Sequence, residues 1–301
     1  MNNIQLFDVA AGSGGYLTRG VMRYAFFSTK PHHRSALLVE QAIHRLLDSF
    51  PPPRIDAVTN DNGDWISTDL SGLKQSASDE LVGTNSGINS SISFAGSQAN
   101  LPDYSIDYSG IATDRAVFKQ ATCVLWLSVA LTAYEENEVL LHALSREIAE
   151  GLMCSTAYVS PAVVGDKRTR ESLAMRYKGL DISGPRQVAR DLSNKLPGIF
   201  WQTYLHKDIA QTLGGTIALE SLLSSEAEIA TADSGGLWIK LGTQPRFGDL
   251  NHQEPMVDYE ALAHHIADHG LLHAPTKITY FDGLNEDPDE AQRRYHMRFV
   301  E

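Results

Sequence analysis

Hydrophobic positions recur along the chain at two spacings. Residues 20–30, "GVMRYAFFSTK", are rich in aromatic and β-branched side chains and predict a strand. Apolar residues then repeat at helical spacing through 33–50, and the prolines at 51–53 end that predicted helix. The same order returns at 122–163, where an amphipathic helix over 135–152 separates two apolar runs. The pattern therefore predicts two similar strand–helix–strand units.

These two units indicate an α+β protein with two similar halves, in which mainly antiparallel sheets are flanked by helices. The first half spans 1–118 and the second spans 119–301; one compact domain built from both is the alternative. Residues 71–100 are rich in Ser, Gly and Asn, which predicts a long mobile loop in the first half.

The pattern predicts further elements in the second half. They are a helical segment at 185–196, a helix from Gly198 to Gly214, a strand pair over 227–242, a helix at 258–272 and an edge strand at 294–301. Gly and Pro residues punctuate each boundary, as expected for helix and strand ends.

The composition is acidic, with 37 Asp and Glu against 25 Lys and Arg and a net charge of -12. Nucleic-acid affinity depends on cationic contacts to phosphate, so direct nucleic-acid binding is disfavoured. An acidic surface suits solubility or a basic protein partner. Cys123 and Cys154 lie in apolar runs, which favours small core residues over a disulfide framework.

The chain shows no pattern of membrane insertion or export. Its longest apolar run has about a dozen residues, whereas a spanning helix needs about twenty. The first fifteen residues lack the basic and apolar regions of a secretory signal. We therefore expect a cytoplasmic protein without a membrane partner.

Motifs that carry chemistry are incomplete in this sequence. His265 and His269 have a spacing at which both could face one metal, but Ile266 stands where a zincin has Glu, which favours a polar helix face. The N-terminal "AAGSGG" lacks the Lys-Ser/Thr pair of a phosphate loop, and no G-x-S-x-G occurs. The sequence therefore predicts no catalytic, cofactor-binding or metal-binding residues and favours a protein that is not an enzyme.

Two acidic segments are candidate contacts for a basic partner, together with the predicted loop at 71–100. They comprise Glu135, Glu136 and Glu138 in one segment and Glu286, Asp287, Asp289 and Glu290 in the other. Charge runs of this kind also occur simply as solvated surface.

The segment 234–251, "SGGLWIKLGTQPRFGDLN", joins an alternating strand to a turn-rich loop. Polar side chains on a loop after a strand are typical of an active site. Asp249 and Asn251 are also common turn residues, because their side chains hydrogen-bond to nearby backbone. The residue types alone fit both a catalytic loop and a structural corner.

Residues 195–270 resemble a family of proteobacterial immunity proteins linked to type VI secretion, the TsiV-like proteins. A Pro-x-x-x-Trp segment matches at Pro197, and Leu205-His206 stand where many relatives have Leu-Gly. The signature residues that carry the resemblance are Trp201, Gly214, Gly215, Gly235, Gly236, Trp238, Gly242, Pro245, Gly248, Asp249 and Asn251. The resemblance implies a structural role for this set and supplies no catalytic residue.

The resemblance also implies a function and a partner. Such proteins bind and neutralise one toxin delivered by a contractile injection system, often encoded by the adjacent gene and frequently a nuclease. A nuclease needs a basic groove to hold DNA, and an acidic protein can be steered into such a groove. An α/β hydrolase-like enzyme and an effector-loading adaptor or chaperone are the alternatives.

Overall fold

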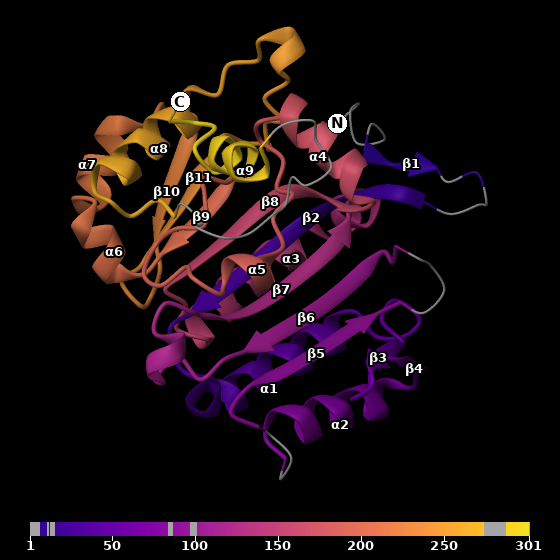
Figure 1. Ribbon diagram of the computed structural model, residues 1–301. Coiled ribbons are helices and arrows are strands. Elements are labelled where there is room, and N and C mark those ends of the chain that lie inside the picture. Colours follow the sequence, from indigo (N-terminus) through magenta and orange to yellow (C-terminus); the bar gives the residue numbers. More distant parts are fainter. Residues whose placement is uncertain are drawn as a thin grey trace.

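The computed structural model describes residues 7–10, 12, 16–83, 87–96, 101–273 and 287–300. Its strands form one antiparallel sheet of 11 strands in the order β10-β11-β9-β8-β2-β7-β6-β5-β3-β4, with β1 paired to β2 (Figure 1). The strands are β1 (Val9–Ala10), β2 (Tyr16–Ser28), β3 (Ala57–Thr59), β4 (Trp65–Ser67), β5 (Ser90–Ala95), β6 (Tyr104–Gly110), β7 (Cys123–Ala130), β8 (Thr156–Gly165), β9 (Gln202–Leu205), β10 (Ala227–Thr231) and β11 (Leu237–Leu241).

Helices flank this sheet, which confirms the predicted α+β class. They are α1 (His32–Ser49), α2 (Leu70–Leu81), α3 (Leu131–Gly151), α4 (Lys167–Arg176), α5 (Pro185–Val188), α6 (Lys207–Thr212), α7 (Gly215–Leu222), α8 (Val257–Asp268) and α9 (Pro288–His296), with short 3-10 turns η2 (Ala116–Phe118) and η3 (Leu250–His252). In Figure 1, α1 and α3 lie behind the central strands, whereas α5 and α9 lie in front.

The central strand β2 connects the two parts of the chain. It pairs with β7 on one side and with β8 on the other, so the sheet runs continuously past residue 118. The helices that follow β2 and β7 both pack in the same large core. A domain boundary near residue 118 stays a prediction.

Successive side chains of β2 point alternately to the two faces of the sheet. Tyr24 and Phe26 join the core beneath α1 and α3, where Ile43 and Leu144 are also buried. Arg23, Ala25 and Phe27 are the intervening residues and therefore point to the front face. Side chains from α5 and the segment after it cover Ala25 and Phe27 there.

The prediction of a mobile loop at 71–100 is wrong for most of these residues, because they form α2 and β5. Leu73, Ala77 and Leu81 repeat every fourth residue, and all three are buried on the inner side of α2. Asp69 caps this helix by accepting a hydrogen bond from the backbone N of Gly72 at 2.8 Å. The Ser and Gly residues of α2 lie outside these three positions and are exposed or half-buried, and the strand β5 follows. Residues 84–86 and 97–100 lie outside the described residues.

Several predicted elements after residue 130 also differ. The helix predicted from Gly198 is strand β9, which pairs with β8 and β11, and α6 begins only at Lys207. The predicted segment at 185–196 is helical only in α5. The tail predicted as an edge strand over 294–301 instead contains the end of α9, with Tyr295 buried, followed by turns at 297–300. In the first two cases, long-range packing overrides local propensity.

Candidate functional site

The signature segment 234–251 forms a hairpin strand and a sharp corner. β11 is paired on both sides, with β10 and with β9. Gly235 lies in the hairpin turn with φ +81°, and Gly242 and Gly248 follow β11 with φ +85° and +64°. Backbone in this left-handed region favours glycine, which explains the residue type at these three positions.

Asp249 holds this corner against α4. Its carboxylate accepts two hydrogen bonds from Arg176, from Nε at 3.2 Å and from Nη2 at 2.9 Å. The backbone N of Asn251 and the ring of His252 make further contacts at 3.0 and 2.8 Å. The bonds from Arg176 are the largest cause that holds the pKa of Asp249 well below its usual range. All of these partners belong to the chain itself, which is the arrangement expected of a structural corner.

The other signature residues pack around the same end of the sheet. Trp201 is 1% exposed and donates from Nε1 to the carbonyl of Gly242 at 3.1 Å. Trp238 is buried against Tyr204, with ring centroids 5.3 Å apart. Gly214 and Gly215 join α6 to α7, Gly236 lies tightly against Tyr204, Pro245 is half-buried and Asn251 is exposed. The structural role of the signature stays a prediction that substitution tests.

The acidic candidates do not form one surface. Glu135 and Glu136 are exposed on α3, and Glu138 is half-buried with its carboxylate 3.6 Å from His142. Asp287 is exposed, and Glu290 pairs with Arg293 at 2.8 Å. Glu286 lies outside the described residues, and the side chain of Asp289 is not among those described.

These two segments lie on opposite faces of the sheet. α3 packs in the core on the rear face with Tyr24 and Phe26. α9 lies in front, where the Tyr295 hydroxyl donates to the carbonyl of Leu180 at 2.9 Å and Asp181 accepts from the hydroxyl of Tyr158 at 2.7 Å (Figure 1). The two acidic segments therefore belong to helices on different faces of the sheet.

The front face of β3 to β7 is a second candidate region, which the sequence analysis did not identify. Pairing places Trp65 opposite Thr59, Ser93 opposite Asp107, and Asp107 opposite Trp126, so side chains form a row across the strands. We call this region the open sheet face and define it by Thr59, Trp65, Ser91, Ser93, Ser105, Asp107, Ser109, Trp126 and Ser128. In Figure 1 none of the described helices lies in front of β5 and β6.

Asp107 lies in the middle of the open sheet face. The hydroxyl of Ser93 donates to its carboxylate at 2.6 Å. Desolvation by burial is the main cause that raises the pKa of Asp107 to about 6, against the lowering effects of Ser93 and of the cations Arg23 and Arg186. This carboxylate therefore carries a proton for part of the time near neutral pH.

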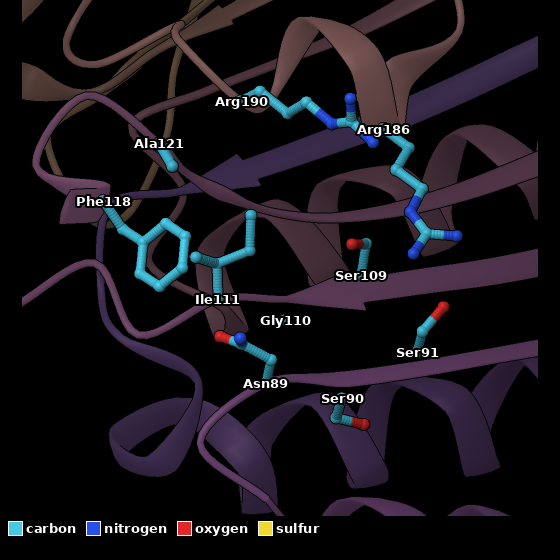
Figure 2. Close-up of a pocket in the computed structure, with 10 residues that line it drawn as sticks. All are labelled: Asn89, Ser90, Ser91, Ser109, Gly110, Ile111, Phe118, Ala121, Arg186 and Arg190. Atoms are coloured by element: carbon cyan, nitrogen blue, oxygen red, sulfur yellow. The ribbon is translucent and has the colours of Figure 1, made fainter. Parts of the chain in front are cut away.

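A pocket of about 440 Å³ lies where the open sheet face meets α5. Its walls are Asn89, Ser90, Ser91, Ser109, Gly110, Ile111, Phe118, Ala121, Arg186 and Arg190. Figure 2 shows Arg186 reaching from the α5 side toward the serine-bearing strands, with the side chain of Arg190 extending toward Arg186. Both are exposed, and among the described residues no carboxylate lies within 4.0 Å of either guanidinium.

The sequence held one signal for this region. Serines alternate with apolar residues in "SSISFA" and "YSIDYSG", which places hydroxyl groups on one face of β5 and β6. Nothing in the sequence connects these strands with Arg186 and Arg190, which come much later in the chain. Their proximity depends on the sheet order.

The histidines of α8 contact backbone carbonyls. His265 Nε2 lies 3.0 Å from the carbonyl of Leu213, and His269 Nδ1 lies 2.8 Å from that of His265. The described residues contain no group of three side chains placed to hold a metal ion. Within the same residues, no helix is both long and apolar enough to cross a bilayer.

Comparison with known proteins shows which fold this chain shares and to which family it belongs. The Pseudomonas aeruginosa T6SS protein PA0821 superposes with a TM-score of 0.74 over 98% of this chain and 88% of its own, at 17% identity, which shows a shared fold. None of the curated proteins compared with the chain matches it. A family described as type VI immunity for VRR-NUC (TsiV) matches residues 39–291, most of the chain. The chain therefore belongs to the TsiV family of type VI immunity proteins for VRR-NUC toxins.

Proposed function

We propose that this chain protects the cell that makes it by binding a VRR-NUC-type nuclease toxin in the cytoplasm, as a stoichiometric inhibitor without chemistry of its own. The family match over residues 39–291 carries this proposal. We further propose that the toxin is encoded by the adjacent gene.

The charge of the chain supports direct binding. A nuclease that holds DNA presents a cationic groove, and a chain with net charge -12 is attracted to such a groove over several ångströms in physiological salt. Glu135 and Glu136 on α3 are exposed and available for such attraction. Glu290 is less available, because its carboxylate already pairs with Arg293.

The environment of the signature carboxylate supports an inhibitor over a hydrolase. A catalytic acid or base must reach a substrate proton, and its pKa is usually tuned toward the working pH. Asp249 instead has a depressed pKa and accepts its hydrogen bonds from Arg176, Asn251 and His252.

Co-expression with the toxin tests the proposal. The product of the adjacent gene is expressed in a susceptible cell with and without this chain, and survival and co-purification are measured. We expect survival and a stable complex. Survival without a complex would favour an enzyme that degrades the toxin or repairs the damage it causes. A complex without survival would favour an effector-loading adaptor.

Charge reversal tests the α3 contact separately. Glu135→Lys/Glu136→Lys should slow association with the toxin through lost long-range attraction, and Glu220→Lys/Asp233→Lys makes the same change in net charge at exposed sites elsewhere. A much larger loss of affinity in the α3 variant would place α3 in the interface itself. Equal binding by the two double variants would exclude α3 from the interface.

A further inference from the structure

We propose that the toxin docks on the open sheet face and that Arg186 and Arg190 bind carboxylates of the toxin. This inference rests on the proposed function, because it names the surface and the chemistry through which the inhibitor would act. Its occupant is the toxin, presenting an acidic group at the pocket.

The open sheet face has the composition of an interface. Trp65 at the outer strand β4 is 53% exposed, and Trp126 is half-buried on β7. The positions between them carry Asp107 and small hydroxyl side chains such as Ser93. Protein interfaces are enriched in Trp and Arg, and exposed tryptophans are frequent anchors.

The two arginines supply a specific chemistry. Arg186 lies in α5 and Arg190 in the turn that follows it, and Figure 2 shows them on the same wall of the pocket. Each guanidinium presents planar N–H donors that match a carboxylate in bidentate geometry. Among the described residues no carboxylate lies within 4.0 Å of either guanidinium, and the charge of Arg186 acts on Asp107 only from a longer distance.

The charges around the pocket complement a nuclease active site. Ser91 lines this pocket and also a neighbouring one that carries Asp61, Asp79 and Glu80. Acidic and cationic groups therefore lie side by side. Metal-dependent nucleases hold their cations with carboxylates at the floor of a groove whose rim must attract DNA phosphate. The acidic residues of this chain are complementary in charge to the basic rim of the nuclease groove. Its two arginines are complementary to the carboxylates that otherwise bind the metal.

Charge reversal at the pocket tests this assignment. The full chain carrying Arg186→Glu/Arg190→Glu is compared with wild type and with Arg34→Glu/Arg146→Glu, two exposed arginines on α1 and α3 at the opposite face. All three proteins are first shown to melt alike, and their affinity for the purified toxin is measured by calorimetry. We expect the pocket variant to bind about 100-fold more weakly or worse, and the control within about threefold of wild type.

A single substitution and a metal titration complete the test. Trp65→Ser on the edge strand should weaken binding about tenfold or more. Saturating Mn²⁺ on the toxin should weaken wild-type binding and leave the residual binding of the arginine variant unchanged. Wild-type affinity in the arginine variant would overturn the docking surface, and affinity that is indifferent to Mn²⁺ would overturn the metal-site carboxylates. Failure of wild type to bind at all would instead contradict the proposed function.

Discussion

Arg176 and Asp249 lie 73 positions apart in the sequence and meet through two hydrogen bonds of 3.2 and 2.9 Å. The pair ties the last turn of α4 to the corner that follows β11. An Asp at this position looks catalytic in the sequence, because it follows a strand in a turn-rich loop. In the structure its hydrogen bonds connect two segments of the same chain.

Substitution of Asp249 should therefore lower stability. Asp249→Ala removes the contacts to Arg176, Asn251 and His252 and should lower the melting temperature, whereas Asp249→Asn should lower it less, because the amide oxygen can still accept from backbone N–H. Thermal melts of the two variants beside wild type measure this. A fully stable Asp249→Ala protein that no longer binds toxin would place the corner in the interface instead.

The same pair predicts a dependence of stability on pH. The folded-state pKa of Asp249 is depressed, so its contribution is present above its unfolded value of about 4 and disappears as pH falls through the folded value. The advantage of wild type over Asp249→Asn should be constant from neutral pH to about pH 5 and should shrink below about pH 4. Chemical denaturation at several pH values tests this, and an advantage that grows in acid would contradict it.

The buried pair Arg23–Asp181 should be sensitive to loss of either partner. Their charged atoms are 2.9 Å apart with side chains 5% and 0% exposed, and Asp181 also accepts from Tyr158 and Ser183. Asp181→Ala leaves Arg23 charged without its partner and should lower the unfolding free energy by about 3–5 kcal/mol. Tyr158→Phe removes one hydrogen bond and should cost about 1 kcal/mol. Equal losses in urea unfolding would show that the charge is not the main cause.

Asp107 should behave in the opposite sense to Asp249. Its folded pKa is raised to about 6, so the charged form opposes folding above that pH, and this cost decreases as pH falls from about 6 to about 4. Because the side chain is partly exposed, we expect Asp107→Asn to stabilise the protein by only about 1 kcal/mol at pH 8. The gain should vanish near pH 4, and a gain independent of pH would contradict burial of charge as its cause.

The glycine pair between α6 and α7 offers a matched comparison. Both glycines have positive φ, but a Cβ on Gly214 would lie 2.7 Å from the Cβ of Ala218, whereas a Cβ on Gly215 would meet nothing within 4 Å. Gly215→Ala should cost about 1 kcal/mol from backbone strain alone, and Gly214→Ala should cost about 2 kcal/mol or more. Urea unfolding of both variants distinguishes strain from steric conflict.

Local pattern predicted the elements whose packing is visible within one segment. α1 carries a continuous apolar stripe, and the β10–β11 hairpin has alternation on both sides of a Gly-Gly turn. α2 was missed because Ser and Gly dilute a stripe of only three buried residues. The sequence did not predict β9, because its pairing partners are β8 and β11. The spacing of apolar residues within one segment does not show which distant strands that segment pairs with.

The family was recognisable from the sequence, but the candidate docking surface was not. Glycines and turn residues at 235–251 have a fixed spacing along the chain, so their pattern can be recognised from the sequence alone. The pocket at Arg186 joins α5 to strands β5 and β6, which are adjacent only because of the sheet order. Arginines and serines that lie this far apart in the sequence form no local pattern from which their proximity could be predicted.

The most direct test of the central claim is the DNA-cleaving activity of the purified toxin, measured against increasing amounts of this chain. Stoichiometric inhibition predicts a linear fall in activity that ends near equimolar protein, with no turnover of the inhibitor. Undiminished DNA cleavage in the presence of excess chain would contradict the account.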